Sequence, residues 1–238
     1  MLKIRSDQVL RSNNQLCNWM NATTIDKLNL DITCSYALRS ELLPDCFFTS
    51  GIKMLRLSTK QLLPITMCSA QHIIILKLVD VTFPDADSDG QLILSCPILK
   101  VLVMKNCEIN HLKTLLVSTP QLEHIKLCIE NSSLDCKKNL CCPMLKSLYW
   151  RGKYADEISI MNYSALTRVT LKDLGYCCLG FEAQLMFIKC LFENAKVLKR
   201  MVVYYSVYVC EKVKEFEDKV FELPRASSDL SISVIPFL

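Results

Sequence analysis

A six-residue pattern of apolar and polar positions recurs along most of the chain. Its first, fourth and sixth residues are apolar, and the residues between them vary. The pattern begins at Ile25, Ile52, Ile73, Leu99, Leu122, Leu145, Leu166 and Leu198. Successive starts lie 21 to 27 residues apart, except for a final interval of 32 residues. A period of this length indicates one structural unit that is repeated and stacked along an axis.

The hexamer predicts a short β-strand in each repeat. Because side chains alternate across a strand, the fourth and sixth residues share one face and point into the core, while the residues between and after them point away. The first six intervals lie within the roughly 20 to 29 residues that are typical of leucine-rich repeats. We therefore expect an α/β leucine-rich-repeat solenoid, in which a curved parallel sheet is joined by outer loops and short helices.

The stretch CPILKVLVMKNC illustrates one repeat. Pro97 comes just before the expected strand, where its missing amide donor costs no hydrogen bond between strands. Cys107 follows the strand, at a position where a side chain can satisfy backbone groups of the turn. We expect residues 83–90 to form an outer loop, and residues 91–96 to form the short outer helix that leads back to the strand.

The pattern changes towards the C-terminus. Apolar residues three and four positions apart predict one amphipathic helix within residues 180–195 and a second within residues 208–223. The alternating segment 231–237 predicts a final strand. We accordingly divide the chain into an N-terminal cap segment, 1–24, the repeats, 25–175, and a C-terminal region, 176–238, that is continuous with the solenoid and covers its end.

The C-terminal region resembles the FBD domain that closes many plant F-box/leucine-rich-repeat proteins. The residues that carry this resemblance are Asn194, Ala195, Leu198, Lys199, Met201, Leu223, Pro224, Arg225, Ala226, Ser227 and Ser228. Residues 18–32, which include Trp19, and the Cys-Pro-x-Leu segments of the middle repeats are also similar to this family. The resemblance implies a non-catalytic subunit that recognises substrates for an SCF-type E3 ubiquitin ligase.

One feature of that family is missing, because nothing before Trp19 resembles an F-box. Two hypotheses therefore stay open. In the first, the chain is the substrate-binding part of a ligase subunit, and it meets a Skp-type adaptor and a cullin if an F-box lies upstream. In the second, it is a stand-alone leucine-rich-repeat binding protein or a truncated gene product without a ligase role. The target protein is not identified by either hypothesis.

Composition and charge narrow the cellular setting. The chain has 238 residues, of which 51% are hydrophobic, but its longest apolar runs are too short to span a bilayer. The first residues lack the apolar core of a secretory signal, so we expect an intracellular protein, nuclear or cytoplasmic, whose 14 cysteines are mostly reduced. A formal net charge of +4 with interleaved signs is weaker than the basic patch of a dedicated nucleic-acid binder.

Candidate chemistry is sparse. His72, His111 and His124 are the only histidines, and none is spaced from another as metal ligands on a helix would be. The vicinal pairs at 141–142 and 177–178, with Cys136 nearby, do not have the spacing of a zinc site. With five glycines and no glycine-rich phosphate loop, the sequence predicts neither an enzyme nor a metal or other cofactor.

The outward positions of the strands are the best candidates for binding. On the expected concave sheet they bring together Arg56, Lys77, Lys105, Lys126, Tyr149 and Arg151. Cations beside an aromatic ring are suited to an acidic or phosphorylated segment of a partner protein. The alternative is that these charges only keep an exposed sheet soluble and discourage edge pairing.

A first prediction concerns the N-terminal edge of the solenoid. The apolar residues before the first repeat are few, and they include Val9, Leu10, Leu16, Trp19 and Met20. Since so thin a cap leaves apolar surface uncovered, the chain produced alone should self-associate, which size-exclusion chromatography with light scattering measures. A monodisperse monomer that melts cooperatively would contradict this expectation.

Overall fold

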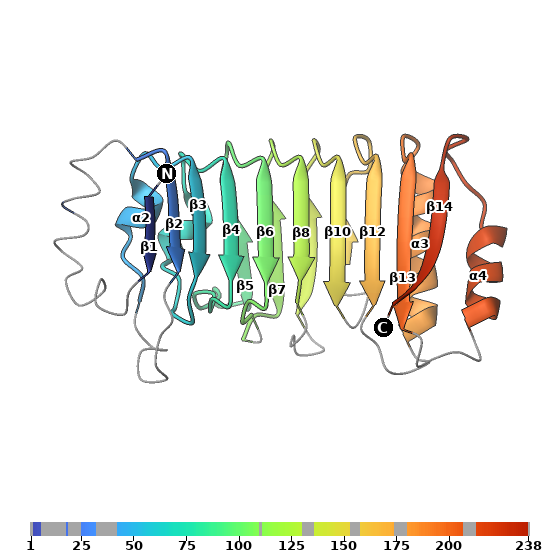
Figure 1. Cartoon of the computed structure of the whole chain (residues 1–238), viewed down its shortest axis with the longest axis horizontal. Coiled ribbons are helices and arrows are strands. Elements are labelled where there is room, and N and C mark those ends of the chain that lie inside the picture. The colour runs from blue at the N-terminus through green and yellow to red at the C-terminus, as the bar shows by residue number, and fades with distance from the viewer. Residues whose placement is uncertain are drawn as a thin grey trace.

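Two parallel β-sheets face each other across a single core. The computed structural model describes residues 2–5, 18, 25–31, 42–109, 111–129, 136–152, 158–173, 180–206 and 213–237. The larger sheet has ten strands: β1 (Leu2–Arg5), β2 (Lys27–Asp31), β3 (Met54–Ser58), β4 (Ile75–Val79), β6 (Val101–Lys105), β8 (His124–Cys128), β10 (Ser147–Gly152), β12 (Arg168–Asp173), β13 (Arg200–Ser206) and β14 (Ser231–Phe237). They run side by side from the blue to the red end of the molecule (Figure 1).

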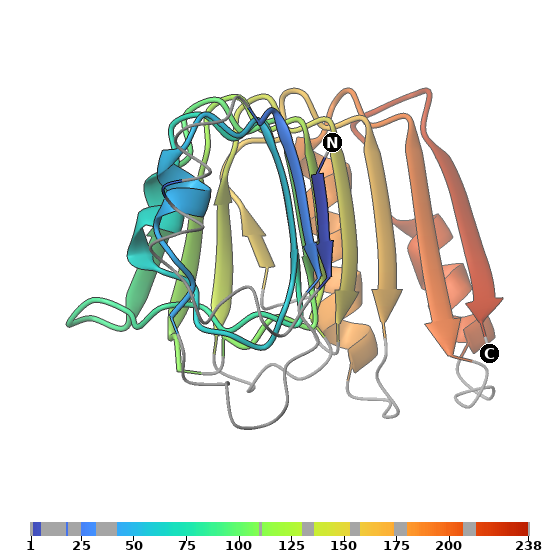
Figure 2. The same cartoon turned by 60° about the vertical axis from the view of Figure 1, so that its left-hand side comes forward.

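The smaller sheet lies behind the larger one (Figure 2). Its four strands are β5 (Gln91–Leu94), β7 (Thr114–Ser118), β9 (Lys137–Cys141) and β11 (Ile158–Ile160). From β4 to β12 the chain alternates between the two sheets, and all strand pairs are parallel. The chain is therefore a parallel-sheet solenoid, which is compatible with a leucine-rich repeat.

The predicted core positions are confirmed. In all eight hexamers the fourth and sixth residues are at most 2% exposed. The strand register also places equivalent residues next to each other, as in Leu76, Leu102 and Ile125. Burial of one such aliphatic side chain contributes on the order of 1.5–3 kcal/mol, and that burial requires the neighbouring repeat.

The prediction of an outer helix over residues 91–96 is wrong, because residues 91–94 form strand β5. Leu92 and Leu94 are buried while Ile93 between them is 43% exposed, and this period of two suits a strand. The short outer helices occur earlier in the chain, as α2 (Cys46–Thr49) and a 3-10 helix, η3 (Ile65–Ser69). Residues 83–90 form the expected loop, which ends at Gly90 with a φ of 79°.

The prolines before the strands occupy a defined turn. The amide of Leu99 donates to the carbonyl of Cys96, so Pro97 is the second residue of a four-residue turn. The same bond recurs from Leu122 to Thr119 and from Leu145 to Cys142. Proline is favoured at this position because its fixed φ matches the turn.

Both ends of the larger sheet differ from the repeats. At the N-terminus, β1 pairs with β2, and the sequence pattern did not predict β1. The rest of segment 1–24, apart from residue 18, lies outside the described residues. At the C-terminus the chain forms α3 (Gly180–Asn194), α4 (Val213–Glu222) and the edge strand β14. The first predicted helix and the final strand are confirmed. The second helix begins no earlier than Val213 among the described residues, and it buries Phe216 and Val220.

A second prediction concerns the close packing at the end of β10. A Cβ atom placed on Gly152 would lie 2.5 Å from Cζ2 of Trp150, a side chain that is only 2% exposed. Gly152→Ala should therefore lower the free energy of unfolding by about 1–3 kcal/mol, as measured by urea denaturation.

Gly51→Ala is the matched control, because nothing lies within 4 Å of a Cβ placed there. Its free energy of unfolding should stay within about 0.5 kcal/mol of the parent. Equal stability of the two variants would show that the contact with Trp150 is easily relieved.

Candidate cationic site on the larger sheet

The outward side chains of the larger sheet form rows across neighbouring strands. The row between the two core positions runs Asn29, Arg56, Lys77, Val103, Lys126, Tyr149, Thr170 and Val202. The next row runs Asp31, Ser58, Val79, Lys105, Cys128, Arg151, Lys172 and Tyr204. We call this surface the open face. All six predicted binding residues lie on it.

The open face carries mostly positive charge. Its cationic side chains from β2 to β13 are Lys27, Arg56, Lys77, Lys105, Lys126, Arg151, Arg168, Lys172 and Arg200. Among the outward positions of these same strands, Asp31 is the one acidic residue. The mild net charge of the whole chain therefore conceals a face with a strong excess of cations.

A shallow hollow of about 180 Å³ concentrates part of this charge. It is lined by Val79, Lys105, Asn106, Lys126, Cys128, Tyr149 and Arg151. Four of the six predicted residues therefore come together here, whereas Arg56 and Lys77 do not line the hollow. The ammonium of Lys126 lies 4.2 Å from the centre of the Tyr149 ring, a cation–π contact that holds it beside the hollow.

The hollow forms where a short side chain stands between two long ones. Cys128 lies in register between Lys105 and Arg151, and it is 6% exposed. Asn106, which follows β6 with a φ of 50°, donates its backbone amide to the carbonyl of Cys128 at 2.8 Å. Val79, Asn106 and Cys128 are not among the predicted site residues, although the spacing of the hexamers places Val79 and Cys128 in this row.

Tyr149 presents a protonated hydroxyl group. Burial raises the pKa of this phenol above its ordinary value, and nearby Cys128 and Tyr204 raise it further, while Arg151 opposes them. The hydroxyl therefore stays a hydrogen-bond donor at neutral pH.

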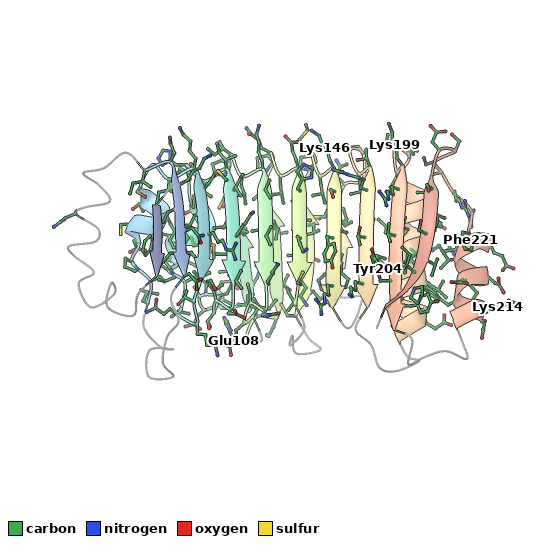
Figure 3. All side chains as sticks on the ribbon, in the orientation of Figure 1. Glu108, Lys146, Lys199, Tyr204, Lys214 and Phe221 are labelled. Carbon is green, nitrogen blue, oxygen red and sulfur yellow. The ribbon has the colours of Figure 1, made fainter. Side chains whose placement is uncertain are left out.

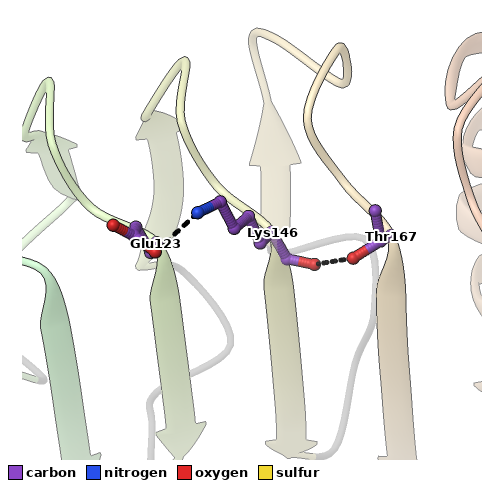
Figure 4. Close-up of polar contacts among 3 residues, drawn as sticks. All are labelled: Glu123, Lys146 and Thr167. Carbon is purple, nitrogen blue, oxygen red and sulfur yellow. Dashed lines mark hydrogen bonds and ion pairs between the residues drawn. The ribbon is translucent and has the colours of Figure 1, made fainter.

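One ion pair among the described residues lies where β8 and β10 begin. The ammonium of Lys146 lies 2.7 Å from Oε2 of Glu123, and the hydroxyl of Thr167 donates to the carbonyl of Lys146 at 3.0 Å (Figure 4). The hydrogen bond from Lys146 lowers the pKa of Glu123. Lys146 and Lys199 lie where the strands begin, and Glu108 lies at the other edge (Figure 3). The hollow lies near the ends of β6, β8 and β10, away from the Glu123 carboxylate.

Two acids do lie close to the end of β6. Glu108 accepts a hydrogen bond from the hydroxyl of Thr82 at 3.1 Å. Asp80 has a φ of 56° and donates its amide to the carbonyl of Lys105. Neither acid lines the hollow, so the described part of its lining carries positive charge without a carboxylate.

The residues that carry the family resemblance lie at the junction of α3, β13 and the segment before β14. Ala226 donates its amide to the carbonyl of Phe192, and the buried hydroxyl of Ser227 donates to the carbonyl of Leu198 at 2.8 Å. Ala195, Leu198 and Met201 are buried in the core.

Other residues of this group make exposed hydrogen bonds within the C-terminal region. Asn194 donates to the carbonyl of Cys190, Arg225 donates to that of Phe221, and Ser228 donates to Asp229. Leu223 packs against the core, whereas Pro224 and Lys199 are exposed. These contacts are structural, and the residues lie apart from the hollow.

The other candidate residues are dispersed. His72 is exposed, His111 lies 3.0 Å from the carbonyl of Pro84, and His124 is half-buried on β8. Within the described ranges no group of three or more histidine, cysteine or acidic side chains is arranged to hold a metal ion. The pair at 177–178 lies outside the described residues.

Most cysteines in the described ranges are free thiols, as expected, but Cys46 is disulfide-bonded. Several thiols in the repeats donate to backbone carbonyls: among them, Cys96 donates to Met67 at 3.4 Å, Cys142 to Val117 at 3.4 Å, and Cys107 to Lys105 at 3.5 Å. The bond from Cys107 confirms the role expected of that position in the turn.

No family model matches this chain, and neither the curated proteins nor the solved structures contain a match to it. The helices in the described ranges include none that is long and apolar enough to cross a membrane. The class defined by the fold and the site is therefore a parallel-sheet solenoid with a cationic open face.

A third prediction concerns these thiols. Burial raises the pKa of Cys107 to about 12 and that of Cys96 to about 11. Because the thiolate is the reactive form, iodoacetamide at pH 8 should modify the half-buried Cys141 and Cys190 well before Cys96 and Cys107 in the folded protein. Mass spectrometry of timed digests measures the order.

The same pKa values predict a pH dependence of stability. A thiol whose folded pKa is raised stabilises the fold fully below its unfolded pKa of about 8.5. That contribution is lost as the pH rises from about 8.5 towards the pKa values of the folded protein, so the free energy of unfolding should fall over this range.

In the labelling experiment, equal rates of modification for all four cysteines in the folded protein would contradict the burial of Cys96 and Cys107.

Proposed function

We propose that this chain is a non-catalytic protein-recognition module that binds a partner through the open face of its larger sheet. The observation that carries this proposal is the set of cationic rows on that face, where strand register gathers lysines and arginines from separate repeats. A rigid sheet holds these side chains at fixed spacing, so a partner with matching negative charge binds with little loss of conformational freedom by the module.

We further propose that the partner is a substrate of an SCF-type E3 ubiquitin ligase. The support for this step is the resemblance of residues 194–201 and 223–228 to the FBD domain of plant F-box proteins. In such an assembly the module supplies proximity, because it holds the substrate near the subunits that transfer ubiquitin. A Skp-type adaptor and a cullin join through an F-box, which this chain would need upstream of Met1.

A fourth prediction tests the ligase role. An antibody raised against residues 223–234 should detect a native protein markedly heavier than 27.2 kDa, and its additional N-terminal peptides should contain an F-box. Immunoprecipitation with this antibody should then recover a Skp-type adaptor and a cullin, while pre-incubation with the immunising peptide should remove both signals.

A native protein that runs near 27.2 kDa without adaptor or cullin would contradict the ligase role. The stand-alone binding protein would then replace it, because recognition through the open face does not depend on an F-box.

A further inference from the structure

The hollow on the open face differs from the rest of that face in its shape and in the number of cations that meet there. Lys105, Lys126 and Arg151 all line it, and none of the described residues around it contributes a carboxylate. Within the described part of the chain, neither Lys105 nor Lys126 forms an ion pair with an acidic side chain. A desolvated anion in this hollow would therefore meet the positive charge of these two lysines, which no described acidic side chain neutralises.

The strand register sets the arrangement of the three cations. Lys105, Cys128 and Arg151 are in register on β6, β8 and β10, so the backbones of the two outer residues lie about 10 Å apart, twice the usual spacing of about 4.8 Å between strands. Lys126 lies two residues before Cys128, on the same face of the middle strand. The three positions form a triangle around the short Cys128 side chain, and long side chains at its corners can reach one ligand above the cysteine.

Hydrogen-bond donors of different geometry complete the site. The two lysines offer ammonium groups and Tyr149 offers a protonated hydroxyl, while the planar guanidinium of Arg151 adds positive charge at the third corner. A phosphate monoester carries a charge of about −1.5 to −2 and three strong acceptor oxygens, whereas a carboxylate carries one charge and two oxygens. The donors around the hollow match the phosphate more completely.

We propose that this hollow is the binding site for a phosphorylated serine or threonine within an acidic segment of a partner protein. The inference rests on the proposed function, since it names the ligand chemistry for the same recognition face. Arg56 and Lys77 lie to one side of the hollow in the adjoining strands, and Lys172 lies to the other. These flanking cations would meet acidic residues on either side of the phosphorylated residue, which a free phosphate ion lacks.

The test uses synthetic probes and the full chain. Two pools of fluorescent 11-residue peptides have identical, glutamate-rich random flanks, and they differ only in a central phosphoserine or serine. Binding is measured by fluorescence anisotropy at fixed ionic strength, with inorganic phosphate as a competitor. We expect the phosphoserine pool to bind about tenfold more tightly or better than the serine pool. Millimolar inorganic phosphate alone should compete only weakly.

Two double variants that remove the same charge separate the hollow from the surrounding face. Lys105→Gln with Lys126→Gln should abolish the preference for phosphoserine, reducing that pool's affinity about tenfold or more. Arg56→Gln with Lys77→Gln is the matched control, because these residues lie on the same face without lining the hollow. The control should weaken both pools by a similar, smaller factor, and thermal melting should show that both variants fold.

A variant with the opposite effect guards against a general loss of function. Asp80 follows β4 and bonds the backbone of Lys105, and its left-handed backbone accepts asparagine. Asp80→Asn should strengthen binding of the phosphoserine pool by about twofold, since it removes a nearby negative charge.

Each other outcome rejects a definite part of the proposal. Equal binding of both pools, weakened equally by both double variants, would contradict the phosphate-binding site. The proposed binding of an acidic partner through the open face would remain. Inorganic phosphate that competes as well as the peptides would identify a free-anion site instead. Absence of binding to both pools, with tight binding of duplex DNA or of vesicles rich in anionic lipid, would contradict both the phosphate-binding site and the proposed function.

Discussion

The stacking of half-buried strands is the constraint on which the rest of this structure depends. Each strand of the larger sheet that belongs to a hexamer, from β2 to β13, carries two inward apolar side chains, and they become buried only when strands with the same register lie on both sides. The alternation between two sheets closes the core from behind. A single repeat would leave this apolar surface in water, so the fold is stable only as an array with covered ends. β1 and the α3–β14 region provide strands and helices at those ends.

The same register determines the chemistry of the surface. When core residues are forced into line, the residues between them are forced into line as well, and side chains more than a hundred residues apart in sequence become members of one row. A mutation that shifted one strand by a single residue would exchange its core and surface positions. The cationic face is therefore protected by the hydrophobic core, because any slip that disrupts the rows also exposes leucines.

Much of this architecture could be predicted because the hexamer repeats. The periodicity identified the strands of the larger sheet from β2 to β13, their buried residues and both outward rows. The smaller sheet was missed, since four residues such as Gln91–Leu94 are too few to distinguish a period of two from one turn of helix. The hollow was missed for a different reason: it arises from the difference in length between Cys128 and its neighbours Lys105 and Arg151, and it becomes visible only when the strands are aligned. The disulfide at Cys46 had no signal in the repeat pattern.

The unequal spacing of the hexamers has a consequence for how such a protein can change. Successive hexamers start between 21 and 32 residues apart, yet the strands of the larger sheet pair without a break in register from β2 to β14. The differences in length are absorbed behind that sheet, where one repeat forms a strand, another a 3-10 helix and another the long helix α3. Insertions and deletions there are separated from the rows in front. A lineage could therefore remodel the back of the molecule extensively while the front retains its partner, or exchange a few outward side chains and acquire a new one without altering the scaffold.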